Sequence, residues 1–207
     1  MPGKLNLENA YPAVAANATE AALNEPLRCE ALFLRAFCHF ELYRYYSNTS
    51  VGSELAVAYM ETPSLASTAR ITLTPFVAKL KADMAAAKPL LPTALTDLYR
   101  ATRPAVSALQ ARVALYLKEY ADAVTFSSEY ITALPLATRA NFPAIWTDAN
   151  NSELAFKLSR TPSVGGRIGS LFQGISANSG NISQTAWVPS TILMGVYDQA
   201  KDVRFGV

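Results

Sequence analysis

Histidine and cysteine are scarce in this sequence. The chain of 207 residues has one histidine and two cysteines. Protein sites for zinc and similar metals combine several such side chains at fixed spacings, and neither His-x-x-x-His nor Cys-x-x-Cys is present. Gly-x-Ser-x-Gly, Gly-x-x-x-x-Gly-Lys and Gly-x-Gly-x-x-Gly, which mark hydrolase, phosphate-binding and dinucleotide-binding sites, are also missing. The sequence therefore predicts no metal site and no cofactor.

Charge of either sign is also low. Only 16% of the residues are charged, the net charge is +2, and the basic residues are scattered along the chain. A nucleic-acid-binding surface needs clustered basic side chains, so this class of function lacks electrostatic support. No run of about 18 apolar residues occurs, because Arg35, His39 and Glu41 interrupt the most hydrophobic segment. We therefore expect no helix that spans a bilayer.

The length and the first residues limit the organisation. At about 100 to 200 residues per domain, the length predicts a single domain, 1–207. The first residues contain neither the apolar core nor the small-residue cleavage site of a secretory signal. We therefore expect either a cytosolic protein or one from which a leader has been removed.

The N-terminal part is rich in helix-forming residues. Residues 8–24 predict a first helix that starts near Pro12, and residues 26–46 predict a second. In the second helix the apolar positions cover most of the helical wheel and leave two narrow polar stripes, which is typical of a helix covered on two sides in a stack. Cys29 and Cys38 would lie about 13 Å apart on opposite faces, beyond disulfide reach, and we expect both to be small core residues.

Two further helices begin at prolines. Thr74-Pro75 predicts an N-cap and a first helical position, and the Lys-Pro-Leu-Leu-Pro segment from residue 88 ends that helix. Arg103-Pro104 opens a helix that runs through residue 118, and residues 120–134 form its partner after a tight turn. In the helix that starts at Thr74, the apolar face is formed by Phe76, Leu80, Met84 and Ala87, and the solvated face by Lys79, Lys81, Asp83 and Lys88.

The second pair of helices matches a repeat template. In a window of about 34 residues from Pro104, Ala111, Tyr120, Ala123 and Pro135 occupy the small, aromatic, small and terminating positions of a tetratricopeptide unit. A generic antiparallel helix pair with alanines at the crossing is the alternative. Residues 33–36 and 110–113 occupy similar places on their helices, which favours two related hairpins separated by an insertion.

Beyond residue 136 the helical pattern weakens. Residues 153–159 alternate well enough to predict a short strand, and residues 161–189 are rich in Gly, Ser, Asn and Thr and predict mostly loop. Ser190 can cap a last short helix through Tyr197. The sequence therefore predicts a mainly helical, all-α fold, with helices in 8–135 and a loop-rich extension in 136–207.

Few residues are candidates for catalysis. His39 could act as a general base, but it lies on a polar stripe one turn from Arg35, and we interpret it as structural. Asp148 and Glu153 flank an Asn-Asn-Ser segment and could form a carboxylate pair, but nothing in the sequence fixes their separation, so a structural role is favoured here too.

Several segments in order resemble one family. Residues 30–37, Glu-Ala-Leu-Phe-Leu-Arg-Ala-Phe, and residues 40–44, Phe-Glu-Leu-Tyr-Arg, resemble the Gly-Glu-Ala-x-Phe-Leu-Arg-Ala helix of the SusD/RagB-like proteins, the outer-membrane nutrient-binding lipoproteins of Bacteroidetes. Asp83 with Ala86 and the Leu-Pro pair at 91–92 is similar to the family's Asp-Leu-x-x-Ala followed by Leu-Pro.

Later segments carry the resemblance further. Residues 111–117, with Tyr120 and Ala123, are similar to the family's tetratricopeptide-like hairpin. Residues 151–153, Asn-Ser-Glu, resemble its Asn-Ser-Glu before a strand, and residues 202–204, Asp-Val-Arg, resemble its Asp-x-Arg. The resemblance covers about residues 11–206.

Two departures from the family pattern accompany this resemblance. Cys29 stands where the family usually has Gly, and residues 53–57, Ser-Glu-Leu-Ala-Val, replace its Gly-x-Pro-Leu segment. Family members are also much longer. The chain therefore resembles the N-terminal helical part of such a protein, truncated before the C-terminal half and without the lipoprotein leader.

The resemblance implies a function and a set of partners. It implies a non-catalytic, cell-surface protein of the outer membrane, lipid-anchored in its full-length form. Such a protein captures glycans or other nutrients for import by a TonB-dependent, SusC-like transporter. Because sugar rings stack on exposed aromatic faces, it implies that Trp187 is the best candidate for carbohydrate binding, followed by Tyr46 and Asn48.

Two alternatives stay open on the residues alone. One is an intracellular scaffold whose tetratricopeptide-like groove binds a peptide or a partner protein. The other is a hydrolase or lyase on a helical scaffold, with Asp148 or Glu153 as acid or base.

Overall fold

The computed structural model describes residues 18–47, 49–147, 149–159, 173–175, 182–185, 190–198 and 200–202. Helices dominate the described residues, which confirms the predicted mainly helical fold. The elements in chain order are α2 (Ala18–Tyr46), α3 (Leu73–Ala87), the 3-10 helix η1 (Lys88–Leu90), α4 (Arg103–Tyr116), α5 (Tyr120–Ala133), α6 (Phe142–Trp146), β1 (Gln173–Ile175), β2 (Ile182–Thr185) and α8 (Thr191–Val196).

The chain divides into two compact units, each described by itself. The first contains residues 1–136 and 153–157, and the second contains residues 137–152 and 158–207. In the second unit, β1 and β2 pair antiparallel, with an irregular step between Gly174 and Ile175. These two short strands lie within 161–189, the stretch predicted to be mostly loop. The other residues of that stretch lie outside the described ranges, so the prediction of mostly loop stays a prediction there. Ser190 caps α8 as predicted, by accepting a hydrogen bond from the Leu193 N–H at 3.2 Å.

A single helix replaces two predicted ones at the N-terminus. α2 runs from Ala18 to Tyr46 through Pro26, so the predicted division between helices 8–24 and 26–46 is wrong within the described residues. A proline inside a helix removes one backbone hydrogen bond and clashes with the preceding turn. Burial of Cys29, Leu32 and Phe33 directly after Pro26 opposes that cost, because these side chains lie in the core of the first unit.

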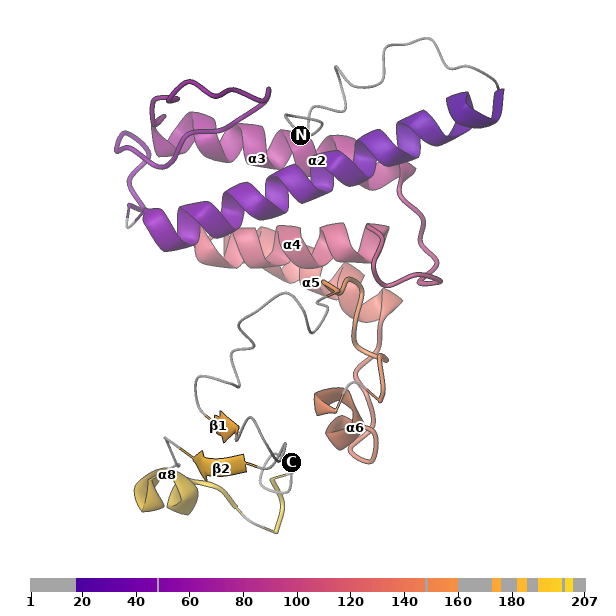
Figure 1. Ribbon diagram of the computed structural model, residues 1–207, viewed down its shortest axis with the longest axis vertical. Coiled ribbons are helices and arrows are strands. Elements are labelled where there is room, and N and C mark those ends of the chain that lie inside the picture. The colour runs from indigo at the N-terminus through magenta and orange to yellow at the C-terminus, as the bar shows by residue number, and fades with distance from the viewer. Residues whose placement is uncertain are drawn as a thin grey trace. The chain divides into compact units, whose positions relative to one another are not determined.

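The core of the first unit lies along α2, which runs between α3 and α4 (Figure 1). Phe40 is fully buried and meets the Tyr116 ring of α4 edge-on at 5.7 Å, and Tyr43 packs against Phe76 of α3 at 5.4 Å. One broad apolar face of α2 thus touches both neighbours. Of the two cysteines, Cys29 is buried and Cys38 is exposed, so the prediction of a core position for Cys38 is wrong; both are free thiols, as their spacing predicts.

α3 starts two residues earlier than the sequence predicts. Thr72 is its N-cap position, and Thr74 lies inside the first turn, so the prediction of Thr74 as the cap is wrong. Both the Thr74 N–H and its hydroxyl donate to the Gly52 carbonyl at 3.1 Å. A Cβ at Gly52 would lie 2.5 Å from Thr74 Oγ1, so a glycine allows this close approach. The predicted apolar face of α3 is buried as expected.

The helical hairpin of α4 and α5 is confirmed. Thr102 caps α4 by accepting from the Ala105 N–H at 3.3 Å, with Pro104 in the first turn. Lys118 adopts φ of 63° in the turn, which lets the chain reverse within three residues before α5. The two helices pack closely along their length.

The predicted strand at 153–159 is wrong. These residues form no regular element and have no described strand beside them. Residues 155–157 instead bond to the residues that lead into α4: the Thr102 hydroxyl donates to the Ala155 carbonyl at 3.2 Å, and the Lys157 N–H donates to the Leu98 carbonyl at 2.8 Å. Burial does not follow the alternation in the sequence: Ala155 is buried, both of its neighbours are half-buried and Leu158 is exposed. Phe156 meets the Phe33 ring at 5.2 Å.

Replacement of Phe40 by Ala tests whether the face of α2 between α3 and α4 holds the first unit together. We expect Phe40→Ala to lower the free energy of unfolding by about 3 to 5 kcal/mol, because it leaves a cavity against Tyr116. Leu42→Ala, at a side chain that is 45% exposed on the same helix, should cost less than about 1 kcal/mol. Urea denaturation followed by circular dichroism measures both, and equal losses for the two variants would contradict this packing.

Candidate functional site

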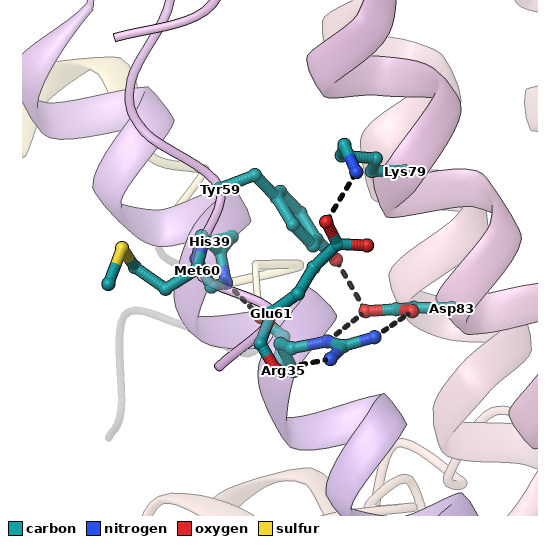
Figure 2. A network of polar contacts seen from close by, with 7 residues as sticks. All are labelled: Arg35, His39, Tyr59, Met60, Glu61, Lys79 and Asp83. Carbon is teal, nitrogen blue, oxygen red and sulfur yellow. Dashed lines mark hydrogen bonds and ion pairs between the residues drawn. The ribbon is translucent and has the colours of Figure 1, made fainter. Parts of the chain in front are cut away.

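A buried ion pair links α2 to α3. Arg35 Nε and Nη2 donate to the two carboxylate oxygens of Asp83, each at 2.6 Å, and the side chains are only 20% and 10% exposed (Figure 2). This two-bond arrangement matches the planar guanidinium to the planar carboxylate. The prediction of Asp83 on the solvated face of α3 is therefore wrong, because Arg35 offsets the cost of burying its charge.

Tyr59 adds a third member to this pair. It comes from the segment between α2 and α3, and its hydroxyl donates to Asp83 Oδ2 at 2.5 Å. Its ring packs edge-on against Phe76 at 5.6 Å. Burial, together with the hydrogen bond to Asp83, raises the pKa of Tyr59, so its hydroxyl stays protonated and keeps donating. The Asp83 carboxylate is thus held from both sides.

His39 is locked in one neutral tautomer beneath Tyr59. The Met60 N–H donates to His39 Nε2 at 2.8 Å, so Nε2 carries no proton, and Nδ1–H donates to the Arg35 carbonyl at 2.8 Å. The two rings stack with centroids 4.1 Å apart. Burial lowers the pKa of His39, with the neighbouring Arg35 charge acting in the same direction. Both ring nitrogens are engaged, which supports the structural interpretation of this residue.

Glu61 and Lys79 complete the outer edge of the network. Lys79 Nζ contacts Glu61 Oε2 at 2.5 Å, and Arg35 Nη1 lies 3.4 Å from the Glu61 carbonyl (Figure 2). Residues 59–61 are therefore fixed to both α2 and α3. The groups of this network are satisfied by one another, so the arrangement holds the connection between the helices in place.

The connecting loop, residues 47–72, is also closed at its base. Leu55 and Thr72 form an isolated antiparallel bridge, and the Ala56 N–H donates to the Ile71 carbonyl at 2.9 Å. The Arg70 guanidinium donates to the carbonyls of Leu55, at 2.8 Å, and Ala56. The exposed part of the loop between these points is held at both ends.

The end of α2 presents aromatic rings to solvent. Tyr45 and Tyr46 are 73% and 72% exposed, whereas Tyr43 beneath them is buried and donates from its hydroxyl to the Thr49 carbonyl at 2.6 Å. The Arg44 guanidinium lies 5.6 Å from the Tyr45 ring centroid. We call Tyr45 and Tyr46 the aromatic end of α2. Because Tyr43 anchors the last turn, these rings stand on a fixed backbone.

Of the three predicted carbohydrate-binding residues, only Tyr46 lies within the described residues. Tyr46 is exposed at the aromatic end, as a ring that stacks on a ligand must be. Asn48 and Trp187 lie outside the described residues, and their sharing of one site with Tyr46 stays a prediction. Asp148 also lies outside them, so its pairing with Glu153 stays untested; the Glu153 carbonyl accepts from the Tyr130 hydroxyl at 2.5 Å.

The network of Arg35, Asp83, Tyr59 and His39 was missed by the sequence reasoning. Arg35 and Asp83 each stand in a segment that carries the family resemblance, and this could have signalled that they pair. Tyr59 gives no such signal, because the segment around it has no periodicity. Within the part of the chain that the structure describes, no three His, Cys, Asp or Glu side chains gather as metal ligands, and no helix combines the length and apolarity needed to cross a bilayer.

The locked tautomer of His39 makes stability depend on pH. Because the folded state lowers the pKa of this histidine, its contribution is complete above the pKa of the unfolded chain, about 6.5, and is lost as the pH falls below that value. Protonation would put two N–H donors, Nε2–H and Met60 N–H, against each other. We expect the free energy of unfolding to fall between about pH 7 and pH 5.5.

His39→Gln provides the control, because Gln carries both a donor and an acceptor and does not titrate in this range. The chain has no other histidine, so the difference between the two stability curves isolates His39. Urea denaturation at a series of pH values measures it. Parallel curves for the two proteins from pH 7.5 to 5.5 would show that the tautomer is not locked.

Comparison with known proteins finds one matching family and several similar solved structures. Residues 7–115, more than half of the chain, match the SusD-like family model that carries the description "Starch-binding associating with outer membrane". A SusD superfamily protein from Bacteroides thetaiotaomicron VPI-5482 superposes with a TM-score of 0.63 at 24% identity, over 76% of this chain and 35% of the other. A candidate sugar-binding protein from Bacteroides vulgatus ATCC 8482 gives a TM-score of 0.63 at 21% identity, over 85% and 41%.

These solved structures share the fold, and this chain spans well under half of the length of each. No match was found among curated proteins. The motif order, the helical hairpins and the family match over residues 7–115 agree, and the chain belongs to the SusD-like family.

Proposed function

We propose that this chain is the helical part of a non-catalytic carbohydrate-binding protein of the outer membrane. The family to which it belongs is described as starch-binding and associated with the outer membrane, and one structural neighbour is a candidate sugar-binding protein. The bound glycans or other nutrients pass to a TonB-dependent, SusC-like transporter for import. In this proposal the full-length protein is lipid-anchored at the cell surface.

The exposed Tyr46 is the observation that carries the binding role. Its ring stands free at the end of a helix whose last turn is anchored through Tyr43. An exposed aromatic face on a rigid support stacks on the apolar face of a sugar ring at low entropic cost. We assign Trp187 and Asn48 to the same function: Trp187 supplies a second ring, and the Asn48 amide supplies a hydrogen-bond partner for sugar hydroxyls.

The state of the titratable groups supports binding rather than catalysis. Both ring nitrogens of His39 are engaged by backbone groups, and Asp83 is held by Arg35 and Tyr59. A general acid or base needs a free path for its proton to a substrate. These buried groups serve the fold.

A second candidate role is protein–protein interaction through the tetratricopeptide-like hairpin. α5 buries only Ala123, while Tyr120, Val124 and Ile131 are exposed on it. An exposed apolar stripe of this kind favours contact with another protein. The transporter named above is a partner of this type, so the two roles are compatible.

Substitution at the aromatic end tests the binding role. We expect Tyr46→Ala to weaken binding of maltoheptaose or of another glycan on a panel about tenfold, because it removes a stacking surface. Trp187→Ala should weaken it at least as much. Isothermal titration calorimetry measures the affinities, and Tyr99→Ala, which removes a tyrosine that is 55% exposed elsewhere on the first unit, is the matched control.

Each result has a defined meaning. If the unmodified protein binds no glycan on a broad panel, the carbohydrate-binding role is wrong. If it binds, but Tyr46→Ala and Trp187→Ala both bind as well as Tyr99→Ala does, the role stands and these residues are not its contacts.

Charge on α5 tests the second role. We expect the double variant Val124→Asp and Ile131→Asp to lose most of its co-purification with a co-expressed SusC-like transporter, because a carboxylate in an apolar contact is poorly solvated. Val51→Asp, at an exposed valine of the connecting loop, should co-purify normally. Retention of the transporter by the double variant would exclude this face of α5.

A further inference from the structure

A cavity of about 650 Å³ lies in the first unit, separate from the aromatic end of α2. Its walls are the first turns of α4, the second half of α5 and the segment that follows α3. This volume is in the range of small-molecule sites. None of the residues that line it belongs to the network around Arg35 or to the predicted carbohydrate-binding set.

The lining of the cavity carries a paired charge. Lys88 Nζ contacts Glu129 Oε2, and the Ser107 hydroxyl donates to the same oxygen at 3.0 Å. Lys88 also donates to Gln110 Oε1 at 2.9 Å, so its ammonium is largely engaged. The hydrogen bonds from Lys88 and then Ser107 lower the pKa of Glu129, which stays a carboxylate with Oε1 available as an acceptor.

One side of the cavity is a row of hydroxyls on α5. Thr125, Ser128 and Thr132 recur at intervals of three and four residues, so they lie on one face of the helix. Each hydroxyl donates to the carbonyl four residues earlier, at 3.0, 2.8 and 2.8 Å respectively. Their protons are therefore used, and their oxygens offer acceptors to a ligand.

The opposite side supplies a donor. Arg103 of α4 lines the cavity, and its Nε and Nη2 donate to the backbone carbonyls of Lys88 and Pro89 at 3.2 and 2.8 Å. These bonds fix the plane of the guanidinium. No acidic side chain of the described residues is paired with it, and its Nη1 group is left as a donor.

This combination selects a ligand by charge and by hydrogen bonding. Lys88 and Glu129 neutralise each other, and the remaining positive charge of Arg103 disfavours a cation. An apolar ligand would strip water from hydroxyls and charges without replacing their hydrogen bonds. A ligand whose groups each donate and accept satisfies all of them. We propose that the cavity binds a neutral sugar unit edge-on, through hydrogen bonds from its hydroxyls to Glu129, Arg103 and the α5 hydroxyls.

The proposal rests on the proposed function only for the choice of sugars as the neutral polyhydroxylated ligand. It differs from that function in mode, because the lining residues include no aromatic ring to stack on. It adds a second contact for a glycan chain, distinct from the aromatic end of α2.

A two-dimensional ¹H–¹⁵N NMR titration with maltose tests the cavity. We expect shifts at the amides of Ser107 and residues 125–133. Glu129→Gln should weaken the interaction about tenfold, because it removes a charged acceptor. The double variant Ser128→Ala and Thr132→Ala should weaken it too; both sites are exposed and Ala favours helix, so the fold is kept. Ser127→Ala, on the same helix but outside the cavity, is the matched control.

The outcomes separate this proposal from the function proposed above. Shifts at residues 125–133 that persist in Tyr46→Ala and are lost in the double variant support the cavity, even if calorimetry finds no long glycan bound. Shifts confined to the aromatic end of α2, or none, overturn the cavity, and glycan binding by calorimetry then decides the other proposal separately. Tighter binding of galacturonate or glucosamine than of maltose overturns the assignment to a neutral sugar.

Discussion

The ion pair between Arg35 and Asp83 fixes how the first unit is assembled. Each charge loses its hydration on burial, and this loss costs several kcal/mol per ion unless the partner is well placed. Two hydrogen bonds of 2.6 Å and a third from Tyr59 provide that placement. α2 and α3 therefore have one favourable register, since sliding either helix by a turn would leave a buried charge unpaired. The aromatic packing around Phe40 and Tyr43 supplies apolar burial but is less selective for register.

The same pair explains why two distant segments carry the family resemblance. Arg35 stands in the Phe-Leu-Arg-Ala segment and Asp83 in the segment followed by Leu-Pro. Tyr116, from the third segment, meets both Phe40 and Tyr43 of the first. The motifs are thus contacts of the core, and they identify the scaffold. In our proposals the ligand contacts come from its exposed parts, namely the aromatic end of α2 and the cavity beside α5.

Sequence reasoning predicted the helices best where start signals and burial agree. Arg103-Pro104 correctly predicted the start of α4, and Ser190 correctly predicted the start of α8. It failed where tertiary contacts override local preference. Pro26 does not end α2, because buried neighbours hold the helix, and Thr74 gives its hydroxyl to Gly52 instead of capping α3. The segment 153–159 alternates in sequence, but burial along it does not follow the alternation, so a periodicity of two predicted a strand that does not form.

The candidate sites show the same limit more strongly. The exposure of Tyr46 could be predicted from the sequence, because an aromatic pair ends a strongly apolar helix directly before a polar loop. Neither the cavity nor the role of Tyr59 could be predicted from the sequence. Both depend on residues that only the fold brings together, such as Lys88 and Glu129, which are 41 positions apart. The prediction that Asp83 is solvated failed because a helical wheel shows which face of the helix a residue occupies. It does not show that a neighbouring helix places Arg35 opposite that residue.

Because the connecting loop is closed at its base, the length of the loop has little effect on the stability of the helices. Leu55 and Thr72 join below the exposed stretch, and the network at residues 59–61 holds one arm. Closing a flexible loop costs only about 0.6 kcal/mol more for each doubling of its length. A change in the length or composition of the exposed tip around Leu65 therefore leaves the contacts at the base of the loop in place. Substitutions at the tip can thus change the exposed surface of this loop without disturbing the contacts that hold α2 against α3.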